Sequence, residues 1–333
     1  MTRFGGWRIA IRSLITQPGF TLTVVGMLSV AIGANTAIFS LINRALLQSL
    51  PFDDPNRLVL GRATFSGDIN PWVSGYDYYD YRDQSQSFES LASMGGGAGP
   101  LTVLVDGQPD RATAMFVSWD LFPTLRVPAA VGRLFTEEDA AEGHDAAVII
   151  SNAYWQRRFG GAPEALNAAI VVDGRPHTIV GVMPATFRFM FDTDAWLLTY
   201  RDGPLANARR FHNLLLLGRL APGISLPAAQ SEMDVVSRRL EQEYPDSNRN
   251  KALRLTPLQD ALVEDARANL WMLMGAVTLV LLMACANVAG LLLARGQRRL
   301  TEVAVRTAVG ATRATLVRQF LIESLLLAFL AGV

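Results

Sequence analysis

A run of 27 residues without a charge, Ala268 to Ala294, constrains this chain more than any other feature. At about 1.5 Å of rise per residue, a helix of this length is roughly 40 Å long. The hydrocarbon core of a bilayer is about 30 Å thick, so such a helix crosses it with some tilt. The run therefore predicts a transmembrane helix, with the residues before and after it on opposite sides of a membrane.

The segment after this run is strongly basic and carries a single acid, Glu302. Under the positive-inside rule, a short loop with such an excess of arginine stays in the cytoplasm. Another apolar stretch begins at Phe320 and continues to Val333, and it predicts a further membrane helix in which the sequence stops. The arginines of the basic segment are Arg295, Arg298, Arg299, Arg306, Arg313 and Arg318.

The formal net charge of zero hides an uneven distribution of charge along the 333 residues. Residues 1–47 carry four arginines and no acid, and residues 48–268 carry 20 basic and 28 acidic residues. The remainder carries six arginines and two glutamates. Basic ends around an acidic middle predict a topology with both ends inside the cell and the middle outside it.

The N-terminal part predicts a first membrane helix over residues 20–47, after a break at Pro18-Gly19. A cleaved signal peptide is the alternative, because an arginine-bearing start precedes the apolar run. The apolar region of a signal peptide spans only about 7 to 15 residues, whereas no charge occurs from Ser13 to Asn43. The length therefore favours an uncleaved anchor with residues 1–19 at the cytoplasmic surface.

Both expected membrane helices carry small residues at every fourth position, a pattern that lets helix backbones approach closely. Alanine and glycine are also simply common in membrane helices, so this pattern has an alternative explanation. Asn35 and Asn287 add polar groups that should face protein rather than lipid. The residues expected in helix packing are Ser29, Gly33, Ala37, Ala286, Asn287 and Gly290.

Residues 48–268 show the mixed pattern of an α+β domain. The Asp106-Gly107 and Asp173-Gly174 pairs stand where hairpin turns require positive φ. One helix is expected over Tyr76–Phe88 and another after Ser225, whose hydroxyl can cap it. The expected strands are Leu101–Val105, Arg111–Val117, Ala146–Ile150, Ala169–Val172, Thr178–Val182, Asn213–Leu220 and Leu253–Leu258.

The histidines and aspartates of this middle region have no spacing typical of a catalytic or metal site. His144, His177 and His212 lie more than thirty residues apart, without an HExxH pattern. The aspartates at positions 77, 80 and 83 have the spacing of a solvated helix face, with an acid and base pair as the minor alternative. We therefore expect no catalytic residue and no bound metal.

Two residues that occur once each narrow the chemistry further. Cys285 is the only cysteine, so a disulfide within the chain and a cysteine-based metal site are excluded. Lys251 is the only lysine and lacks the preceding glycines of a Walker A loop. We expect no cofactor in this chain, and no ATP hydrolysis by a phosphate loop.

The cytoplasmic loop predicts a short helix over Thr301–Val309. Glu302 and Arg306 are four residues apart, a spacing that supports an exposed helix. Gly310 can end that helix in the left-handed conformation, and Thr312 can cap the next one. A partner that grips this short helix would move both flanking membrane helices.

The run ACANVAGLLLARGQRRLTEVAVRTAVGATRATLVRQFLIESLLLAFLAG resembles the second membrane helix, coupling helix and third membrane helix of the MacB/FtsX-like ABC transporter permeases. Within that group it resembles the duplicated orphan permeases (ADOP). The start, QPGFTLTVVGMLSVAIGANTAIFSLINRALLQSLPFDDPNRLV, is similar to the first helix of that family. VGRLFTEEDA, VIISNAYWQRRFGG and IVVDGRPHTIVGVMPATFRF resemble its periplasmic core domain. The resemblance covers essentially the whole chain, and AVRTAVGATR is its most specific part.

The resemblance implies an α+β membrane protein in which transmembrane helices flank a mixed α/β MacB-like periplasmic core domain, in the bacterial inner membrane. It implies that a separate nucleotide-binding ABC ATPase subunit hydrolyses ATP and grips the coupling helix, and that the motion reaches the periplasmic domain for export or mechanotransmission. Membrane lipid and a second permease half or copy are further implied partners, and nucleic acid is not. The residues implied at the ATPase contact are Arg298, Arg299, Glu302, Val303, Arg306, Ala308, Gly310 and Arg313.

The resemblance also divides the chain into segments and raises the question of its completeness. Family members have a fourth membrane helix, and the duplicated ones a second copy, so we expect these 333 residues to be unable to transport alone. The expected segments are a cytoplasmic start (1–19), transmembrane helix 1 (20–47), the periplasmic domain (48–268), transmembrane helix 2 (269–294), the cytoplasmic loop (295–318) and a truncated transmembrane helix 3 (319–333).

Glu323 is the one acid expected within a membrane helix, where a carboxylate is costly unless paired. We expect it to pair with an arginine such as Arg318 or Arg295, and the alternative is a proton or coupling relay. For the whole chain, the alternatives are a membrane-anchored envelope receptor or signalling protein, and an anchored envelope enzyme. The sequence has no kinase or HAMP-like segment, which counts against the receptor.

Overall fold

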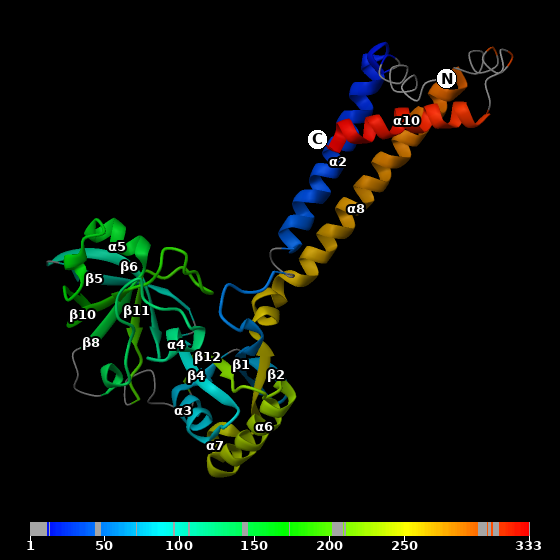
Figure 1. Cartoon of the computed structure of the whole chain (residues 1–333). Helices are drawn as coiled ribbons and strands as arrows, with labels where there is room; N and C mark the ends of the chain where they lie inside the picture. The colour runs from blue at the N-terminus through cyan, green and yellow to red at the C-terminus, as the bar shows by residue number, and fades with distance from the viewer. Residues whose placement is uncertain are drawn as a thin grey trace. The chain divides into compact units, whose positions relative to one another are not determined.

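The chain folds into two units of different secondary structure, one helical and one mixed (Figure 1). The helical unit comprises Met1–Gln48 and Val263–Val333, and the mixed unit, called the ectodomain below, comprises Ser49–Leu262. The computed structural model describes residues 12, 14–43, 48–70, 72–95, 97–105, 107–141, 146–172, 174–201, 209, 211–298, 305, 308 and 313–332.

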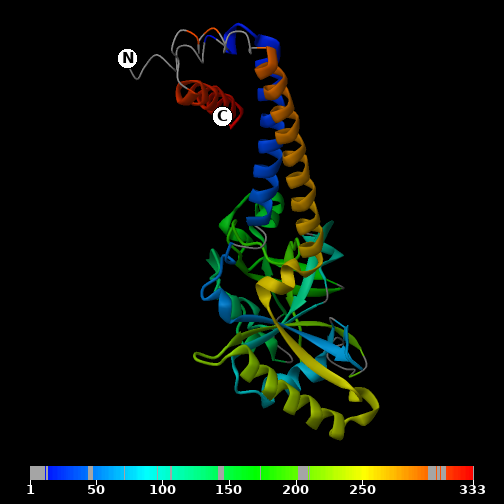
Figure 2. The same ribbon diagram turned by 90° about the vertical axis from the view of Figure 1, so that its right-hand side faces the viewer.

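The helical unit contains α2 (Pro18–Ile42), most of α8 (Leu258–Arg298) and α10 (Arg313–Gly332). Two stretches of the described residues are long and apolar enough to cross a membrane, Pro18–Ile42 with a mean hydropathy of 1.8 and Ala266–Gln297 with 2.4. Within α10, Leu321–Gly332 is a shorter apolar helix. Figures 1 and 2 both show α2 and α8 running side by side.

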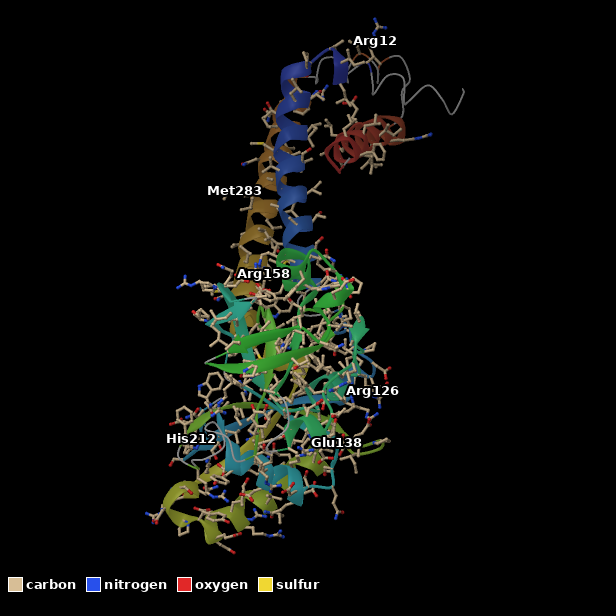
Figure 3. All side chains as sticks on the ribbon, turned by 90° about the vertical axis from the view of Figure 1, so that its left-hand side faces the viewer. Arg12, Arg126, Glu138, Arg158, His212 and Met283 are labelled. Atoms are coloured by element: carbon tan, nitrogen blue, oxygen red, sulfur yellow. The ribbon has the colours of Figure 1, made fainter. Side chains whose placement is uncertain are left out.

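One face of α2 packs against α8. Val24 and Ala31 of α2 are buried, and they lie seven residues apart. Ala284 and Val288 are the buried apolar positions of the α8 span. Val24 lies in one apolar cluster with Val288 of α8 and Leu327 of α10, so α2 packs against both helices there. By contrast, Met283 is 65% exposed and points away from α2 (Figure 3).

The ectodomain is built on one 13-stranded sheet. Six of its strands close on themselves in the order β11-β8-β10-β9-β5-β6, because β6 also pairs with β11. The path then continues from β6 through β4, β12, β1 and β13, with β2, β3 and β7 as short additional strands. The strands are β1 (Leu58–Phe65), β2 (Asp68–Asn70), β3 (Val73–Ser74), β4 (Phe88–Gly95), β5 (Gly99–Val105), β6 (Gln108–Val117), β7 (Val131–Gly132), β8 (Ala146–Ile150), β9 (Ala169–Val172), β10 (Arg175–Val182), β11 (Ala195–Leu198), β12 (His212–Leu220) and β13 (Lys251–Pro257).

Three apolar clusters hold the ectodomain together. The first contains side chains from all six strands of the closed ring, such as Val148 and Ile179, and therefore fills it. The second surrounds Phe122 of α4 (Leu121–Leu125) and includes Leu258, the first residue of α8. The third lies between strands β1, β12 and β13 and the helices α3 (Gly75–Gln84) and α6 (Leu226–Glu243).

Serine side chains set the starts of the three longer ectodomain helices. Ser74 accepts a hydrogen bond from the backbone N–H of residue 77 at 3.2 Å, and Ser151 caps α5 (Asn152–Phe159) in the same way at 3.1 Å. Ser225 caps α6, as its sequence position predicts. The remaining short helices are α7 (Pro245–Asn248) and the 3₁₀ turns η2 (Pro55–Arg57), η3 (Glu138–Ala140) and η4 (Pro163–Ala165).

The predicted strands are confirmed, and those over Ala146–Ile150 and Ala169–Val172 have the predicted bounds. The helix predicted over Tyr76–Phe88 is wrong at its end, because α3 stops at Gln84 and Phe88 begins β4. Phe88 instead packs its ring over Gly218 of β12, where an added Cβ would lie 2.5 Å from that ring. Strands β1, β4 and β11 and helices α4 and α5 were not predicted.

The aromatic cluster around Phe122 yields the first testable prediction. Its ring is fully buried and contacts the rings of Phe135, Phe187 and Trp196, the last at 5.5 Å between centroids. Phe122→Ala is expected to lower the free energy of unfolding of the ectodomain by about 3–5 kcal/mol through lost contacts and the resulting cavity.

The measurement is urea unfolding of the full chain in detergent, followed by tryptophan fluorescence. The matched control is Ile69→Ala, because Ile69 is 51% exposed and its truncation should change stability by no more than about 0.5 kcal/mol. Equal effects of the two substitutions would contradict the assignment of Phe122 to the core.

Candidate functional site

The segment that links α8 to α10 contains the predicted contact with an ATPase. Helix α8 ends at Arg298 and α10 begins at Arg313. Between them, Val305 and Ala308 are helical and exposed. Arg299, Glu302, Val303, Arg306 and Gly310 lie outside the described residues, so their place at a contact stays a prediction.

The predicted helix-packing residues divide into two groups. The Ser29 hydroxyl donates to the backbone carbonyl of Ala331 at 3.0 Å and so joins α2 to α10. The other five are exposed, and an added Cβ at either glycine among them would meet no atom within 4 Å. Their role in packing stays a prediction. These five are Gly33, Ala37, Ala286, Asn287 and Gly290.

Asn35 makes the polar contact between α2 and α8. Its side-chain amide donates to the carbonyl of Val277 and to that of Ala31, at 3.0 Å each. An amide in a hydrocarbon environment needs such acceptors, because lipid tails offer none. The expectation that Asn35 faces protein is confirmed.

Glu323 pairs with Arg295, one of its two predicted partners. Arg295 Nη1 lies 3.7 Å from Glu323 Oε2, and both side chains are buried. The other candidate, Arg318, is exposed on α10.

The ectodomain contains a buried charged cluster around Asp77. A solvated helix face was expected for the three aspartates of α3, and for Asp77 that expectation is wrong, because its side chain is fully buried. Lys251 of β13 donates to one carboxylate oxygen. Asn248 and Arg209 donate to the other, at 2.9 and 3.1 Å. Asp77 thus links α3 to α7 and β13 and has a structural role.

The partners of Asp77 determine its ionisation. Burial opposes the charged form, but Lys251, Asn248 and Ser74 together outweigh burial and hold the pKa of the Asp77 carboxyl below its ordinary value of 3.8. Lys251 has a second partner besides Asp77, because its Nζ lies 2.7 Å from His212 Nε2. An ammonium group can only donate, so Nε2 accepts and the proton of a neutral His212 sits on Nδ1.

The other charges of this cluster are also paired. Arg209 donates to Asp80 at 2.6 Å, and its guanidinium carbon lies 3.5 Å from the ring centroid of Tyr244. Among the described residues, no group of three or more histidine, cysteine, aspartate or glutamate side chains could hold a metal ion. The cluster therefore has the features of a structural ion-pair network.

A cavity of about 370 Å³ lies at the carboxyl ends of the parallel strands β6 and β11. Tyr79, Trp119 and Tyr200 line it together with two arginines. Both arginines have acidic partners, Arg82 with Asp120 at 3.5 Å and Arg201 with Asp83 at 2.7 Å. The lining thus combines aromatic surface with neutralised charge.

Two apolar helices long enough to span a bilayer, with an α+β domain in the chain between them, define the class of membrane-anchored proteins with an extramembrane domain. The MacB-like periplasmic core domain family matches residues 20–236, and the FtsX-like permease C-terminal family matches residues 274–333. The chain belongs to the MacB/FtsX-like permease family, which confirms the resemblance to that family found in the sequence. The assignment to the ADOP subgroup stays a prediction.

Individual relatives are distant. The macrolide export ATP-binding/permease protein MacB of Neisseria meningitidis is 24% identical over 205 residues, which cover 60% of this chain and 31% of that protein. The probable export ATP-binding/permease protein MacB of Pseudomonas entomophila is 22% identical over 65% of this chain and 32% of that protein. This chain therefore spans about a third of the length of these relatives.

Among solved structures, the periplasmic region of MacB from Actinobacillus actinomycetemcomitans aligns with a TM-score of 0.45 and 11% identity. The alignment covers 64% of this chain and 94% of that one.

Removing the charge of Asp77 tests the buried cluster. Asp77→Asn is expected to lower the free energy of unfolding by about 3–5 kcal/mol, because Lys251 then keeps a buried charge without its main partner. Adding Lys251→Met to Asp77→Asn should recover part of that loss. The control is Asp83→Asn, which changes a half-exposed carboxylate and should cost no more than about 0.5 kcal/mol.

The same cluster predicts a pH dependence. The folded pKa of Asp77 is below the unfolded value of 3.8, so its stabilisation is present above the unfolded pKa and is lost as the pH falls through the folded pKa. Urea unfolding below about pH 4 should therefore show a steeper loss of stability in the natural chain than in Asp77→Asn. Parallel curves would exclude a paired, ionised Asp77.

Proposed function

We propose that this chain is the permease part of a MacB/FtsX-type ABC transporter, in which a separate nucleotide-binding subunit hydrolyses ATP. That subunit grips the segment between Arg298 and Arg313, called the coupling segment below, and moves it. The membrane helices carry the motion to the ectodomain, for export or mechanotransmission. The chain itself acts without catalysis, metal or cofactor.

The observation that carries the proposal is the continuity of α8. It is one uninterrupted helix of 41 residues from Leu258 to Arg298. Leu258 is fully buried in the apolar cluster around Phe122, and Arg298 is the residue next to the coupling segment. A helix of this length is about 60 Å long. A continuous helix suits the transmission of a push or rotation along its length.

The excess of arginines favours a cytoplasmic location for the coupling segment. Six arginines against Glu302 follow the uncharged run that ends at Ala294, and that excess orients a membrane helix with the loop inside the cell. The proposed topology has the first 19 residues and residues 295–318 in the cytoplasm and residues 48–268 in the periplasm. The proposed spans are 20–47, 269–294 and 319–333, in a bacterial inner membrane. A second permease half or copy, of the duplicated orphan (ADOP) type, completes the transporter.

The topology is tested with single cysteines in a Cys285→Ser background, which removes the only native thiol. Ala308→Cys and Asp68→Cys place thiols at exposed positions of the coupling segment and the ectodomain. In spheroplasts, a membrane-impermeant maleimide should label Asp68→Cys at once and Ala308→Cys only after permeabilisation. Labelling of Ala308→Cys in intact cells would place the segment outside and refute the proposal.

The ATPase contact is tested by affinity purification of the tagged full chain. A co-purifying ABC ATPase is identified by mass spectrometry from its Walker A peptide. Glu302→Arg reverses a charge in the coupling segment and Gly310→Pro changes its predicted helix end, so each should lower ATPase recovery at least about tenfold, equivalent to 1.4 kcal/mol of binding. Asp68→Asn, an exposed ectodomain change, should leave recovery unaltered. Unchanged recovery with Glu302→Arg and Gly310→Pro would contradict coupling through this segment.

A further inference from the structure

Two oppositely charged side chains of the helical unit are almost completely buried. Arg295, near the end of α8, is 8% exposed, and Glu323 of α10 is 3% exposed. Arg295 Nη1 lies 3.7 Å from Glu323 Oε2. A charge removed from water is costly unless an opposite charge lies close to it. The burial of each side chain is therefore explained by the other.

A third helix contributes to the same place. The guanidinium carbon of Arg295 lies 4.6 Å from the ring centroid of Phe20 in α2, within the range of a cation–π contact. One turn further along α2 and α10, Val24 and Leu327 are buried in a common apolar cluster with Val288 of α8. The ion pair thus borders the apolar contact of all three helices.

We propose that Arg295 and Glu323 are positioning residues that tie the two ends of the coupling segment together. Arg295 lies three residues before the end of α8, and Glu323 lies ten residues after the start of α10. The pair therefore closes the intervening chain into a loop whose ends are both fixed. A force on that loop displaces α8 and α10 together. This role rests on the proposed function, whereas the pairing itself does not.

The attraction between Arg295 and Glu323 is electrostatic and does not require a hydrogen bond. A separation of 3.7 Å exceeds the roughly 2.7–3.2 Å of an N–H···O hydrogen bond. Coulomb attraction falls only with the inverse of distance, and it is strong where the dielectric is low. Dispersion contacts between apolar side chains lose about a quarter to a half of their energy when a gap of about 0.5–1 Å opens. The charged pair therefore keeps α8 and α10 together when a force acts on the loop between them.

The test is a distance measurement between spin labels in the full chain, reconstituted in lipid nanodiscs in the Cys285→Ser background. The labels replace Leu293 of α8 and Leu325 of α10, which are 72% and 63% exposed, so the labels do not disturb the packed face. The parent should give one narrow distance distribution. Glu323→Gln and Arg295→Gln should each broaden it and shift it to longer distances.

Exchanging the charges of Arg295 and Glu323 distinguishes electrostatic attraction between them from an effect of packing alone. Arg295→Glu with Glu323→Arg should restore the narrow distribution, and the exposed control Arg318→Gln should leave it unaltered. An unaltered distribution in Glu323→Gln, or no recovery on exchange, overturns the inference. Neither outcome affects the maleimide and ATPase tests, and failure of those tests leaves the distances unchanged. The two proposals can thus fail separately.

Discussion

The helical unit depends on a single constraint, which is that a bilayer interior offers no partner to a polar or charged group. Asn35 meets it with the carbonyl of Val277, and Ser29 meets it with that of Ala331. Arg295 and Glu323, which are both buried from water, meet the same need with each other. These contacts join α2 to α8, α2 to α10 and α8 to α10. Each polar residue thus specifies which helices are neighbours, whereas apolar side chains pack against lipid and protein alike.

A buried charge also needs a partner inside the ectodomain, and Asp77 is the example there. There the carboxylate has several donors, and it joins α3 to α7 and β13 at a site where water is excluded. Breaking such a network by removing one charge is far more costly than replacing the whole network with apolar groups. Asp77 and Lys251 therefore specify one arrangement of these elements more than they add net stability.

The sequence predicts what depends on neighbours in the chain and misses what depends on distant ones. The uncharged run of α8 and the apolar, β-branched runs of β8 and β9 are local signals. Strand β11 is a short apolar run of four residues, and periodicity alone does not distinguish such a run from part of a buried helix. Asp77 looks solvated because Asn248 and Lys251 lie more than 170 residues further along. For Glu323, the sequence predicted an arginine partner but left Arg295 and Arg318 open. The structure identifies Arg295 as that partner.

The glycines of α8 show how the bilayer affects the stability of this helix. Gly275 and Gly290 lie inside this helix without breaking it. In water, each glycine would weaken a helix by about 1 kcal/mol relative to alanine. In a bilayer, a broken helix would leave backbone groups without any partner, so the environment maintains the helix. A membrane-spanning helix therefore tolerates glycines that would weaken the same helix in water.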